Sequence, residues 1–286
     1  MTSATGANLS INTARTALIT GSSDPHAIGF TAARLLAQQH SFNVILSGRR
    51  AQAVQEAVVK LKEELASSSS TARVYGLVLD VDDQSSIDAA VLQLLHPSGP
   101  LLGGALDVVI NNAGVGAPPG RGGKGTNTMF LQTELTTSAD MIKVLTTNVA
   151  APVAVTNALL PLLSRSDRPR VVNVSSARGS LAFGSGLEAE RTGAMVYNTS
   201  KAALNMVTLM QAKNLPKHTG ANLKVNAASP GHVKTAFNNF TGLRSLEEGA
   251  AVYVHLSTLP DDGPTGQLIG NHAPFSTDAS FVPIPW

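Results

Sequence analysis

Short runs of aliphatic residues alternate along the chain with longer stretches in which apolar residues recur at helical spacing. The short runs predict seven strands, at residues 16–20, 43–47, 73–79, 107–110, 170–174, 224–228 and 267–269. The longer stretches predict six helices, at residues 27–39, 51–66, 84–95, 137–163, 194–214 and 245–256. Such alternation is typical of βαβ units, so we expect an α/β fold in which helices flank a doubly wound, seven-stranded parallel sheet.

We expect residues 15–286 to form a single domain, because the predicted elements leave no stretch for a second sheet and no repeat of 20–50 residues occurs. Residues 1–14 are expected to be a flexible N-terminal segment, and residues 236–286 a lid and tail on the substrate side. The composition agrees with a large core, since 43% of the 286 residues are hydrophobic and only 14% are charged.

Charge and cysteine content exclude several kinds of protein. The 21 Lys and Arg residues exceed the 19 Asp and Glu residues by only two, too little for binding nucleic acid. The chain has no cysteine, and its seven histidines lack the paired spacing of metal ligands, so we expect neither disulfides nor a metal site. No run approaches the about 18 uninterrupted apolar residues of a membrane span. We therefore expect a protein that binds no membrane and works in the cytoplasm.

A glycine-containing turn, TGSSDPHAIG over residues 20–29, joins the first predicted strand to the first helix. Backbone N–H groups and the helix dipole can hold a pyrophosphate at such a place. Gly21 permits the tight turn and Gly29 allows the helix to approach closely, with Ser23 and Ile28 as further expected cofactor contacts. For the turn taken alone, a plain connection between a strand and a helix is the alternative.

Two arginines, Arg49 and Arg50, follow the second predicted strand, where a fold that prefers NAD usually has a carboxylate against the ribose 2′-hydroxyl. A guanidinium at this place can form charge-assisted hydrogen bonds to a 2′-phosphate. The pair therefore favours NADP(H) as the cofactor. Two solvated arginines at the start of a helix are the alternative.

Three further segments fit contacts with the same cofactor. Asp80 and Val81, after the third strand, fit an adenine contact. The sequence NNAG over residues 111–114 follows the fourth strand, and its small residues would let the chain pass beside a ribose, although a generic turn explains it as well. Beyond the sixth strand, residues 230–235 offer a rigid turn and a hydroxyl for the nicotinamide carboxamide. The residues expected to take part are Asn112, Ala113, Gly114, Pro230, Gly231, Val233 and Thr235.

Candidate chemistry lies in the second half of the chain. Tyr197 and Lys201 are four residues apart in a predicted helix and therefore share one helix face. An adjacent ammonium favours the phenolate, so we expect Lys201, helped by an oxidised nicotinamide, to lower the pKa of Tyr197. Ser176 lies at the end of the fifth strand, where open α/β sheets bind ligands, and the amide of Asn148 could hold a water that passes protons to Lys201. The YxxxK spacing also arises by chance, as a surface pair.

Taken in order, the glycine turn, NNAG, the helix Asn, the strand-five Ser, YxxxK and the PG turn resemble the short-chain dehydrogenase/reductase superfamily over roughly residues 14–235. The resemblance implies a Rossmann-type fold, a catalytic tetrad of Asn148, Ser176, Tyr197 and Lys201, and cofactor contacts by Tyr197 and Lys201. It also adds His26 to the 2′-phosphate pocket and suggests a likeness to the carbonyl reductases. The expected activity is NADPH-dependent reduction of a ketone of a small apolar molecule. Reduction of an activated C=C or an imine, or a non-catalytic NADPH-binding regulator, are the alternatives.

The chain also departs from the family pattern. The glycine turn is two residues longer than usual, with Ala27 in place of the middle glycine. Ser176 and Tyr197 are 21 positions apart, about eight more than is common, so an extra loop is expected within residues 179–196. Which of Ser175 and Ser176 is catalytic comes from the motif, which favours Ser176.

The walls of the substrate pocket are expected from residues 115–131, 178–196 and 236–244, which follow predicted strands. Arg178, Glu188 and Arg191 are candidate polar contacts there, and solvated loop charges are the alternative. The long helices at 137–163 and 194–214 form dimer faces in related proteins, so the resemblance also implies a homo-oligomer.

Overall fold

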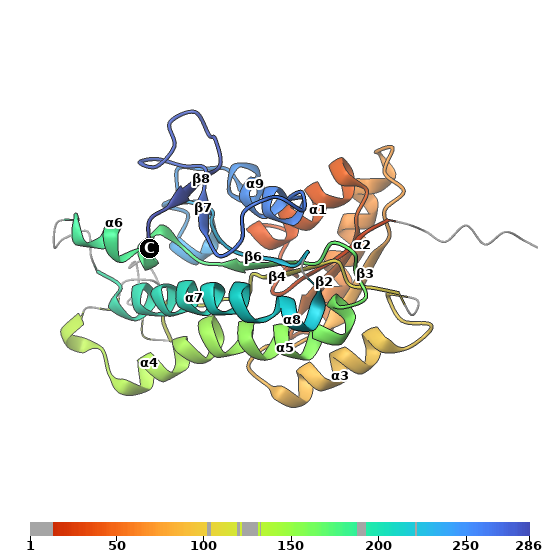
Figure 1. Ribbon diagram of the computed structural model, residues 1–286, viewed down its shortest axis with the longest axis horizontal. Helices are drawn as coiled ribbons and strands as arrows, with labels where there is room; N and C mark the ends of the chain where they lie inside the picture. The colour runs from red at the N-terminus through yellow and green to blue at the C-terminus, as the bar shows by residue number, and fades with distance from the viewer. Residues whose placement is uncertain are drawn as a thin grey trace, which may run out of the picture.

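The computed structural model describes residues 14–101, 104–118, 121, 131, 133–187, 193–220 and 222–286. Within these ranges one sheet carries eight strands: β1 (Thr16–Ile19), β2 (Asn43–Gly48), β3 (Val74–Val78), β4 (Val108–Asn111), β5 (Arg170–Val174), β6 (Lys224–Ser229), β7 (Leu268–Gly270) and β8 (Val282–Ile284). The helices over the same ranges are α1 (Ile28–His40), α2 (Ala51–Ala66), α3 (Gln84–Leu95), α4 (Ser138–Leu145), α5 (Ala151–Leu163), α6 (Leu181–Ser185), α7 (Met195–Asn214), α8 (Pro216–Thr219) and α9 (Leu246–Ser257) (Figure 1).

The strand order is β3-β2-β1-β4-β5-β6-β7-β8, and β1 to β7 run parallel. The predicted doubly wound parallel sheet of seven strands is therefore confirmed in β1 to β7, and the sheet has one strand more than predicted. The eighth strand, β8, pairs antiparallel with β7 at the edge of the sheet. It has only three residues and contains Pro283, which lacks an N–H and is tolerated only at an edge, so its sequence carries no strand pattern.

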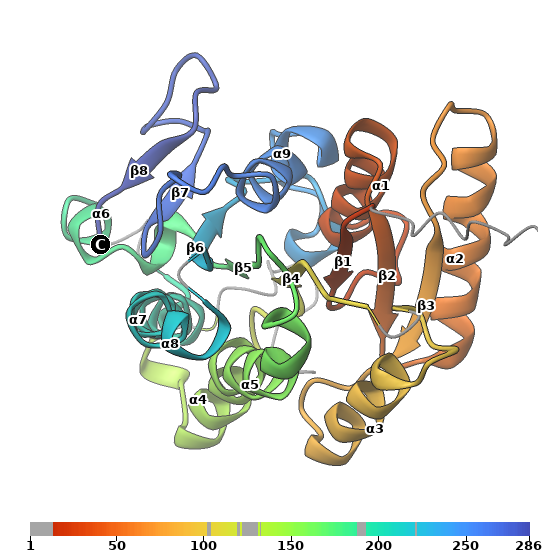
Figure 2. The ribbon, with the colours of Figure 1, turned by 45° about the vertical axis from the view of Figure 1, so that its right-hand side comes forward.

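Helices cover both faces of the sheet because successive side chains on each strand point to opposite sides. Ala17 and Ile19 of β1 belong to the core beneath α1, α2 and α9, whereas Leu18 belongs to the core beneath α3, α5 and α7. Figure 2 shows these two layers on either side of the strands. Because both faces are covered, the strands read as continuous aliphatic runs rather than as alternating ones.

The predicted helix over residues 137–163 is two helices joined by a wide turn. A π-type turn, η2 (Thr146–Ala150), separates α4 from α5. Pro152, in the first turn of α5, has no N–H to donate to the carbonyl of Asn148 four residues earlier, which favours a break in the regular ladder at this point. The wide turn contains Asn148, which the sequence predicts to be a catalytic residue.

The combined run Ser138–Leu163 has 26 residues and contains an 18-residue window with a mean hydropathy of 1.3, so by length and composition it could cross a membrane. Its apolar residues Val155, Leu159 and Leu162 instead lie in the core beneath the sheet. Buried core helices share this composition, so the run gives only weak support for a membrane span.

The strand order reverses at β1 and β4, which are neighbours although the chain passes through β2 and β3 between them. Connections leave these two strands toward opposite sides, so a crevice opens beyond their carboxyl ends. The sequence motifs that follow β1, β2, β3, β4, β5 and β6 all reach this edge of the sheet.

Candidate active site

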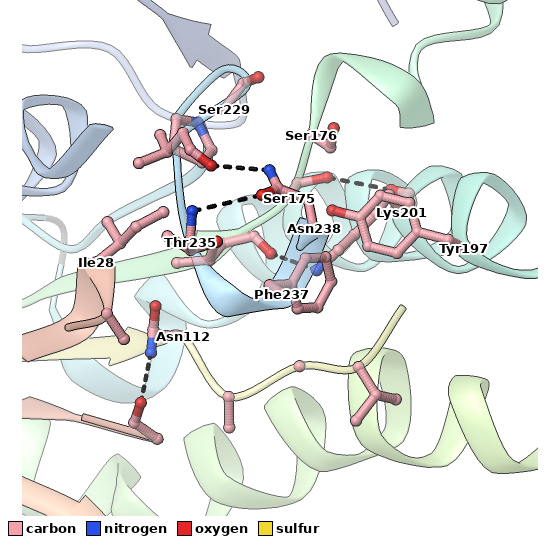
Figure 3. A pocket seen from close by; sticks show the side chains of 18 of the residues that line it. Ile28, Asn112, Ser175, Ser176, Tyr197, Lys201, Ser229, Thr235, Phe237 and Asn238 are labelled. Atoms are coloured by element: carbon pink, nitrogen blue, oxygen red, sulfur yellow. Dashed lines mark hydrogen bonds between the residues drawn. The ribbon is translucent and has the colours of Figure 1, made fainter. Parts of the chain in front are cut away.

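A cavity of about 1130 Å³ lies along the carboxyl ends of the strands. Figure 3 shows Ile28 and Asn112 in one part of it and Ser176, Tyr197 and Lys201 in another. The predicted site residues that line it are Gly21, Ser23, His26, Ile28, Arg49, Arg50, Asp80, Val81, Asn112, Ala113, Gly114, Ser176, Tyr197, Lys201, Pro230, Gly231, Val233 and Thr235. Gly29 and Asn148 do not reach the cavity surface, and both lie directly behind it.

The glycine turn and the segment after β4 form one cradle. Gly21 has a φ of +61°, and a Cβ at this position would lie 2.9 Å from the Cα of Ala113. Asn112 donates from Nδ2 to the carbonyls of Thr20 and Gly21, at 2.8 and 3.0 Å (Figure 3). A side chain on Gly29 would overlap the same amide, so this glycine acts by packing. Two motifs that are far apart in the sequence therefore fix each other.

Arg49 and Arg50 are exposed where β2 ends, beside Ser23 and His26 in the lining of the cavity. None of the ion pairs formed by the described residues involves either guanidinium. Both are therefore available to an anionic group of a ligand at this end of the cavity.

The sequence does not predict one further contact in the lining of the cavity. Asp82 accepts hydrogen bonds at Oδ2 from Lys143 Nζ and Thr147 Oγ1, both at 2.8 Å, and all three residues line the cavity. The contact joins the turn after β3 to α4 and η2. No local pattern could reveal it, because 61 residues separate Asp82 from Lys143.

The structure separates the two candidate serines. Ser175 is 1% exposed, and its hydroxyl contacts Asn205 Oδ1 at 2.5 Å and the carbonyl of Lys201 at 3.3 Å. Both serines line the cavity, and the Oγ of Ser176 accepts from the N–H of Arg178 at 3.2 Å. The geometry therefore favours Ser176 for contact with a ligand, as the motif does.

Tyr197 and Lys201 both face the cavity from one side of α7, with 8% and 5% of their surfaces exposed. Burial raises the pKa of Tyr197 to about 12, against smaller opposing effects of the Ser176 hydrogen bond and the charge of Arg178. Burial also lowers the pKa of Lys201 to about 8.

Without the cofactor, the surroundings of Tyr197 raise its pKa rather than lower it. Lys201 Nζ lies 5.5 Å from the centre of the Tyr197 ring and donates to the carbonyl of Val174 at 2.7 Å. The loss of hydration around the phenol outweighs the ammonium at this distance. The phenol is therefore protonated at neutral pH, which is the form required of a proton donor.

The side chain of Asn148 is committed to other contacts than the expected water. Its Nδ2 donates to the carbonyl of Val115 and to Ser200 Oγ, both at 2.9 Å, while Oδ1 accepts from the N–H of Val115 at 2.8 Å. Both amide protons are thus used within the protein. Asn148 clamps the chain after β4 onto η2, and a Cβ on the neighbouring Gly114 would lie 3.7 Å from Lys201 Nζ.

An aromatic wall closes the other end of the cavity. Phe183 of α6 and Phe275 after β7 meet edge to face with ring centres 5.1 Å apart, and Phe237 lies 5.9 Å from the Tyr197 ring. All three phenylalanines line the cavity. Helix α6 falls within the predicted insertion at residues 179–196, so part of that insertion builds a wall of the site.

Arg178 also lines the cavity and donates to the carbonyl of Gly193 at 3.2 Å. The other two candidate polar contacts, Glu188 and Arg191, lie outside the described residues. Most of the expected wall over residues 115–131 and the N-terminal segment at residues 1–13 lie outside them as well.

The doubly wound sheet, the cradle at its switch point and the tyrosine–lysine pair define an oxidoreductase of the dinucleotide-binding class. The sequence pattern of the family described as short chain dehydrogenase matches residues 15–244, and the chain belongs to this family. The resemblance seen in the sequence is confirmed.

Comparisons with characterised relatives agree. The chain is 33% identical to (+)-neomenthol dehydrogenase from Arabidopsis thaliana, over 89% of this chain and 95% of that protein. It is also similar to the structure of salutaridine reductase from Papaver somniferum, with a TM-score of 0.68, 28% identity, and coverage of 89% of this chain and 99% of that one. An NADPH-bound carbonyl reductase from chicken fatty liver matches with a TM-score of 0.69, 27% identity, and coverage of 90% and 96%.

Proposed function

We propose that this protein is an NADPH-dependent oxidoreductase that reduces the ketone of a small apolar molecule to an alcohol. The observation that carries the proposal is the continuity of the cavity, which runs from Arg49 and Arg50 to Ser176, Tyr197 and Lys201. A cofactor and a substrate can therefore meet in one cavity.

The residues of the cavity fit NADP(H). Its volume exceeds the roughly 300–1,000 Å³ of ordinary small-molecule sites, which leaves room for a dinucleotide together with a substrate. The Gly21 turn presents backbone N–H groups at the start of α1 for the pyrophosphate, and Arg49 and Arg50 suit a 2′-phosphate. Asp80 and Val81, which also line the cavity, would contact the adenine. The carbonyl reductase from chicken fatty liver, a structural relative, is described as NADPH bound. When bound, the reduced nicotinamide supplies the hydride.

The chain's own residues orient the carbonyl and supply the proton. Ser176 donates a hydrogen bond to the carbonyl oxygen and so stabilises the negative charge that develops on it. Tyr197, protonated at neutral pH, donates its phenolic proton to that oxygen. Lys201 binds the ribose of the cofactor and, once its Nζ turns toward the phenol, favours release of the proton. Asn148 holds the segment beside Lys201 in place.

The aromatic wall favours an apolar substrate. Phe183, Phe237 and Phe275 enclose the space next to Tyr197, with Leu187 also in the lining. Burying an alicyclic or polycyclic ketone against such rings is favourable in proportion to the apolar area removed from water. The named relatives include a neomenthol dehydrogenase and a salutaridine reductase.

The test is incubation of the protein with NADPH and a panel of ketones, enones and imines, followed by product mass and NMR. We expect alcohols from bulky ketones, with one NADPH consumed for each. Saturated ketones from enones, or amines from imines, would assign the alternative reductions. Binding of NADPH without turnover of any compound would contradict the enzymatic proposal and favour a regulator.

We also propose a homo-oligomer and retain the cytoplasm as its expected compartment. Ile142 of α4 and Met206 and Met210 of α7 are exposed apolar side chains on neighbouring helices. Large apolar side chains gathered on one face favour association of two copies. Light scattering should give at least twice the 29.5 kDa of one chain, and Met206→Glu should lower it. A monomeric wild-type protein would contradict the proposal.

A further inference from the structure

His272 lies in the C-terminal tail, two residues beyond the end of β7, and belongs to none of the family's sequence motifs. It is 9% exposed and lines the cavity beside Pro274 and Phe275. Its ring packs edge-on against Phe275, with centres 5.7 Å apart. Its place follows from topology, because β7 pairs with β6 and delivers the tail to the turn that follows β6.

The ring of His272 is hydrogen-bonded at both nitrogens. Nδ1 lies 2.9 Å from the carbonyl oxygen of Ala273, which can only accept, so the proton of the neutral ring is on Nδ1. Nε2 lies 2.9 Å from Ser229 Oγ and is then an acceptor, so the Ser229 hydroxyl donates to it. The tautomer therefore follows from the partners.

Ser229 passes this contact on to the candidate catalytic serine. The N–H of Ala177 donates to Ser229 Oγ at 2.9 Å, and Ala177 directly follows Ser176. The hydroxyl thus accepts one hydrogen bond and donates another, and its direction of donation is set by His272. A chain of two hydrogen bonds connects the tail to the backbone at Ser176.

The surrounding backbone holds the ring closely. A Cβ on Gly231 would lie 2.9 Å from His272 Cγ, and one on Gly270 would lie 3.1 Å from Nε2. Gly231 belongs to the turn expected to contact the nicotinamide, and it has a φ of +77°, which favours glycine. The imidazole therefore fills a space between β7 and this turn that both glycines leave open.

Burial and the nearby charge of Arg244 disfavour a positive charge on the His272 ring. Burial lowers the pKa of His272, the contact with the Ala273 carbonyl opposes this, and the charge of Arg244 adds to the lowering. Arg244 donates to the carbonyl and to the side-chain oxygen of Asn271, each at 2.9 Å. The other titratable groups of the elements packed here are Glu248 and Tyr253 of α9, His232 after β6, Arg178 after β5, and Tyr197 and Lys201 of α7. The ring is accordingly neutral at pH 7.

We propose that His272 is a positioning residue for the carbonyl-reducing site: through Ser229 it fixes the backbone of Ala177, and with it the orientation of the Ser176 hydroxyl. This inference rests on the proposed function. It gives the C-terminal tail a role in the reaction, although all of the family's motifs lie before residue 236.

Protonation of His272 should undo this arrangement. Nε2 would then donate, and the Ser229 hydroxyl would have to accept from both His272 and Ala177 while its own proton turns to another acceptor. Ser229 is 1% exposed, so this rearrangement is costly. Turnover should therefore fall on the acid side of neutrality as His272 takes up a proton.

The first experiment compares His272→Gln and His272→Leu, assayed with NADPH and the best ketone of the panel. We expect kcat of His272→Leu to fall about 10- to 100-fold, as for the loss of a buried hydrogen-bond network, while KM and the Kd for NADPH change less than about threefold. Glutamine can accept from Ser229 through Oε1, so His272→Gln should retain most of the turnover at pH 7.5 and lose the acid limb of the wild-type pH profile.

A matched control and a partner variant accompany these two. His255→Gln replaces a histidine of α9 that stacks on Phe281, outside the lining of the cavity, and should leave kcat and the pH profile unchanged. Ser229→Ala should lower kcat to a similar extent as His272→Leu, and the double variant should lose little more. Additive losses in the double variant would overturn the proposed chain.

Imidazole ¹⁵N NMR, with the His272 signals assigned by their loss in His272→Gln, tests the tautomer without any assay of activity. A neutral ring protonated at Nδ1 supports the proposal, and one protonated at Nε2 overturns it. If the wild type reduces ketones and His272→Leu matches its kcat and pH profile, the positioning role is wrong although the proposed function stands. A wild type inactive on the whole panel contradicts the proposed function and this role together, and the NMR result then describes only the hydrogen bond.

Discussion

The two ends of the cavity are built in different ways. At the nucleotide end, each contact follows directly from one strand: Gly21 from β1, Arg49 from β2, Asp80 from β3 and Asn112 from β4. At the substrate end, the walls come from segments with no common pattern, namely α6, the turn η5 (Ala236–Asn238) and the tail after β7.

The difference follows from what each end has to do. The nucleotide end presents backbone groups and charges to a fixed ligand chemistry, so small residues at strand ends suffice. The substrate end is shaped by side chains that pack on one another, as Phe183 does on Phe275 and Phe237 on Tyr197. A change at the first end should therefore alter cofactor affinity alone, and a change at the second should alter substrate choice alone.

The largest effect is expected where the two ends meet. Tyr197→Phe removes the proton donor and keeps the ring, so kcat should fall about 10³-fold or more while the Kd for NADPH changes less than about threefold. Steady-state rates and fluorescence titration check the two values. Tyr75→Phe, in β3 and outside the cavity lining, is the control and should retain activity. Wild-type turnover by Tyr197→Phe would remove the phenol from the mechanism.

The next effect concerns the stability of the protein without cofactor. The pKa of Lys201 is about 8 in the folded protein against 10.5 ordinarily, so between these values the unfolded chain binds more protons. Stability should thus fall as the pH decreases from about 10.5 to 8, and the whole cost of about 3 kcal/mol is present below pH 8. In Lys201→Met this part of the pH dependence disappears.

Urea unfolding at pH 7.5 and pH 10 measures the difference between Lys201→Met and the wild type. The variant should gain stability relative to the wild type at pH 7.5 and lose that advantage at pH 10, while its turnover collapses. The same relative stability at both pH values would mean that the ammonium is not buried at a cost.

A smaller effect separates the two cofactors at the nucleotide end. Arg49→Ala should raise the Kd for NADPH about 10- to 100-fold, since a hydrogen bond to a charged group contributes roughly 1.5–3 kcal/mol, and leave the Kd for NADH within about twofold. Calorimetric titration of both nucleotides gives the ratio. Arg50→Ala, measured in parallel, divides the effect between the neighbours. Equal weakening of NADPH and NADH would refute the 2′-phosphate contact.

The smallest effect concerns substrate choice. Phe275→Ala should raise KM about 5- to 30-fold for bulky alicyclic ketones, because an apolar wall is lost, and change KM for a small ketone less than about twofold. Initial rates across a size series check this. Phe281→Ala, which leaves the cavity lining intact, is the control. A uniform change for all ketones would mean that Phe275 acts on folding rather than on the pocket.

Some features of the fold could be predicted from the sequence, and others could not. The parallel sheet followed from aliphatic runs alternating with helical patterns. The YxxxK pair followed from helical spacing together with the order of the motifs around it. The break between α4 and α5 was missed because an apolar stretch reads the same whether its pitch is regular or wide. Strand β8 was missed because pairing with β7, rather than its own propensity, makes it a strand.

Some chemical properties of the site also differ from what the sequence predicted. The sequence indicated that Lys201, with an oxidised nicotinamide, favours the phenolate of Tyr197. The pKa of the phenol also depends on how much water reaches it, and in the protein without cofactor burial raises that pKa. The amide of Asn148 was expected to hold water, yet Val115 and Ser200 occupy it.

By itself, the sequence determined the fold class, the family and the order in which ligand-binding turns follow the strands, because these depend on local spacing and on residues such as Gly21 whose backbone freedom is intrinsic. Only the tertiary structure decided that the Ser175 hydroxyl bonds to Asn205, which phenylalanines line the cavity and that His272 reaches Ser229 across 43 residues. Such contacts depend on strand order and on the desolvation of side chains, and no short segment of the sequence determines either of them.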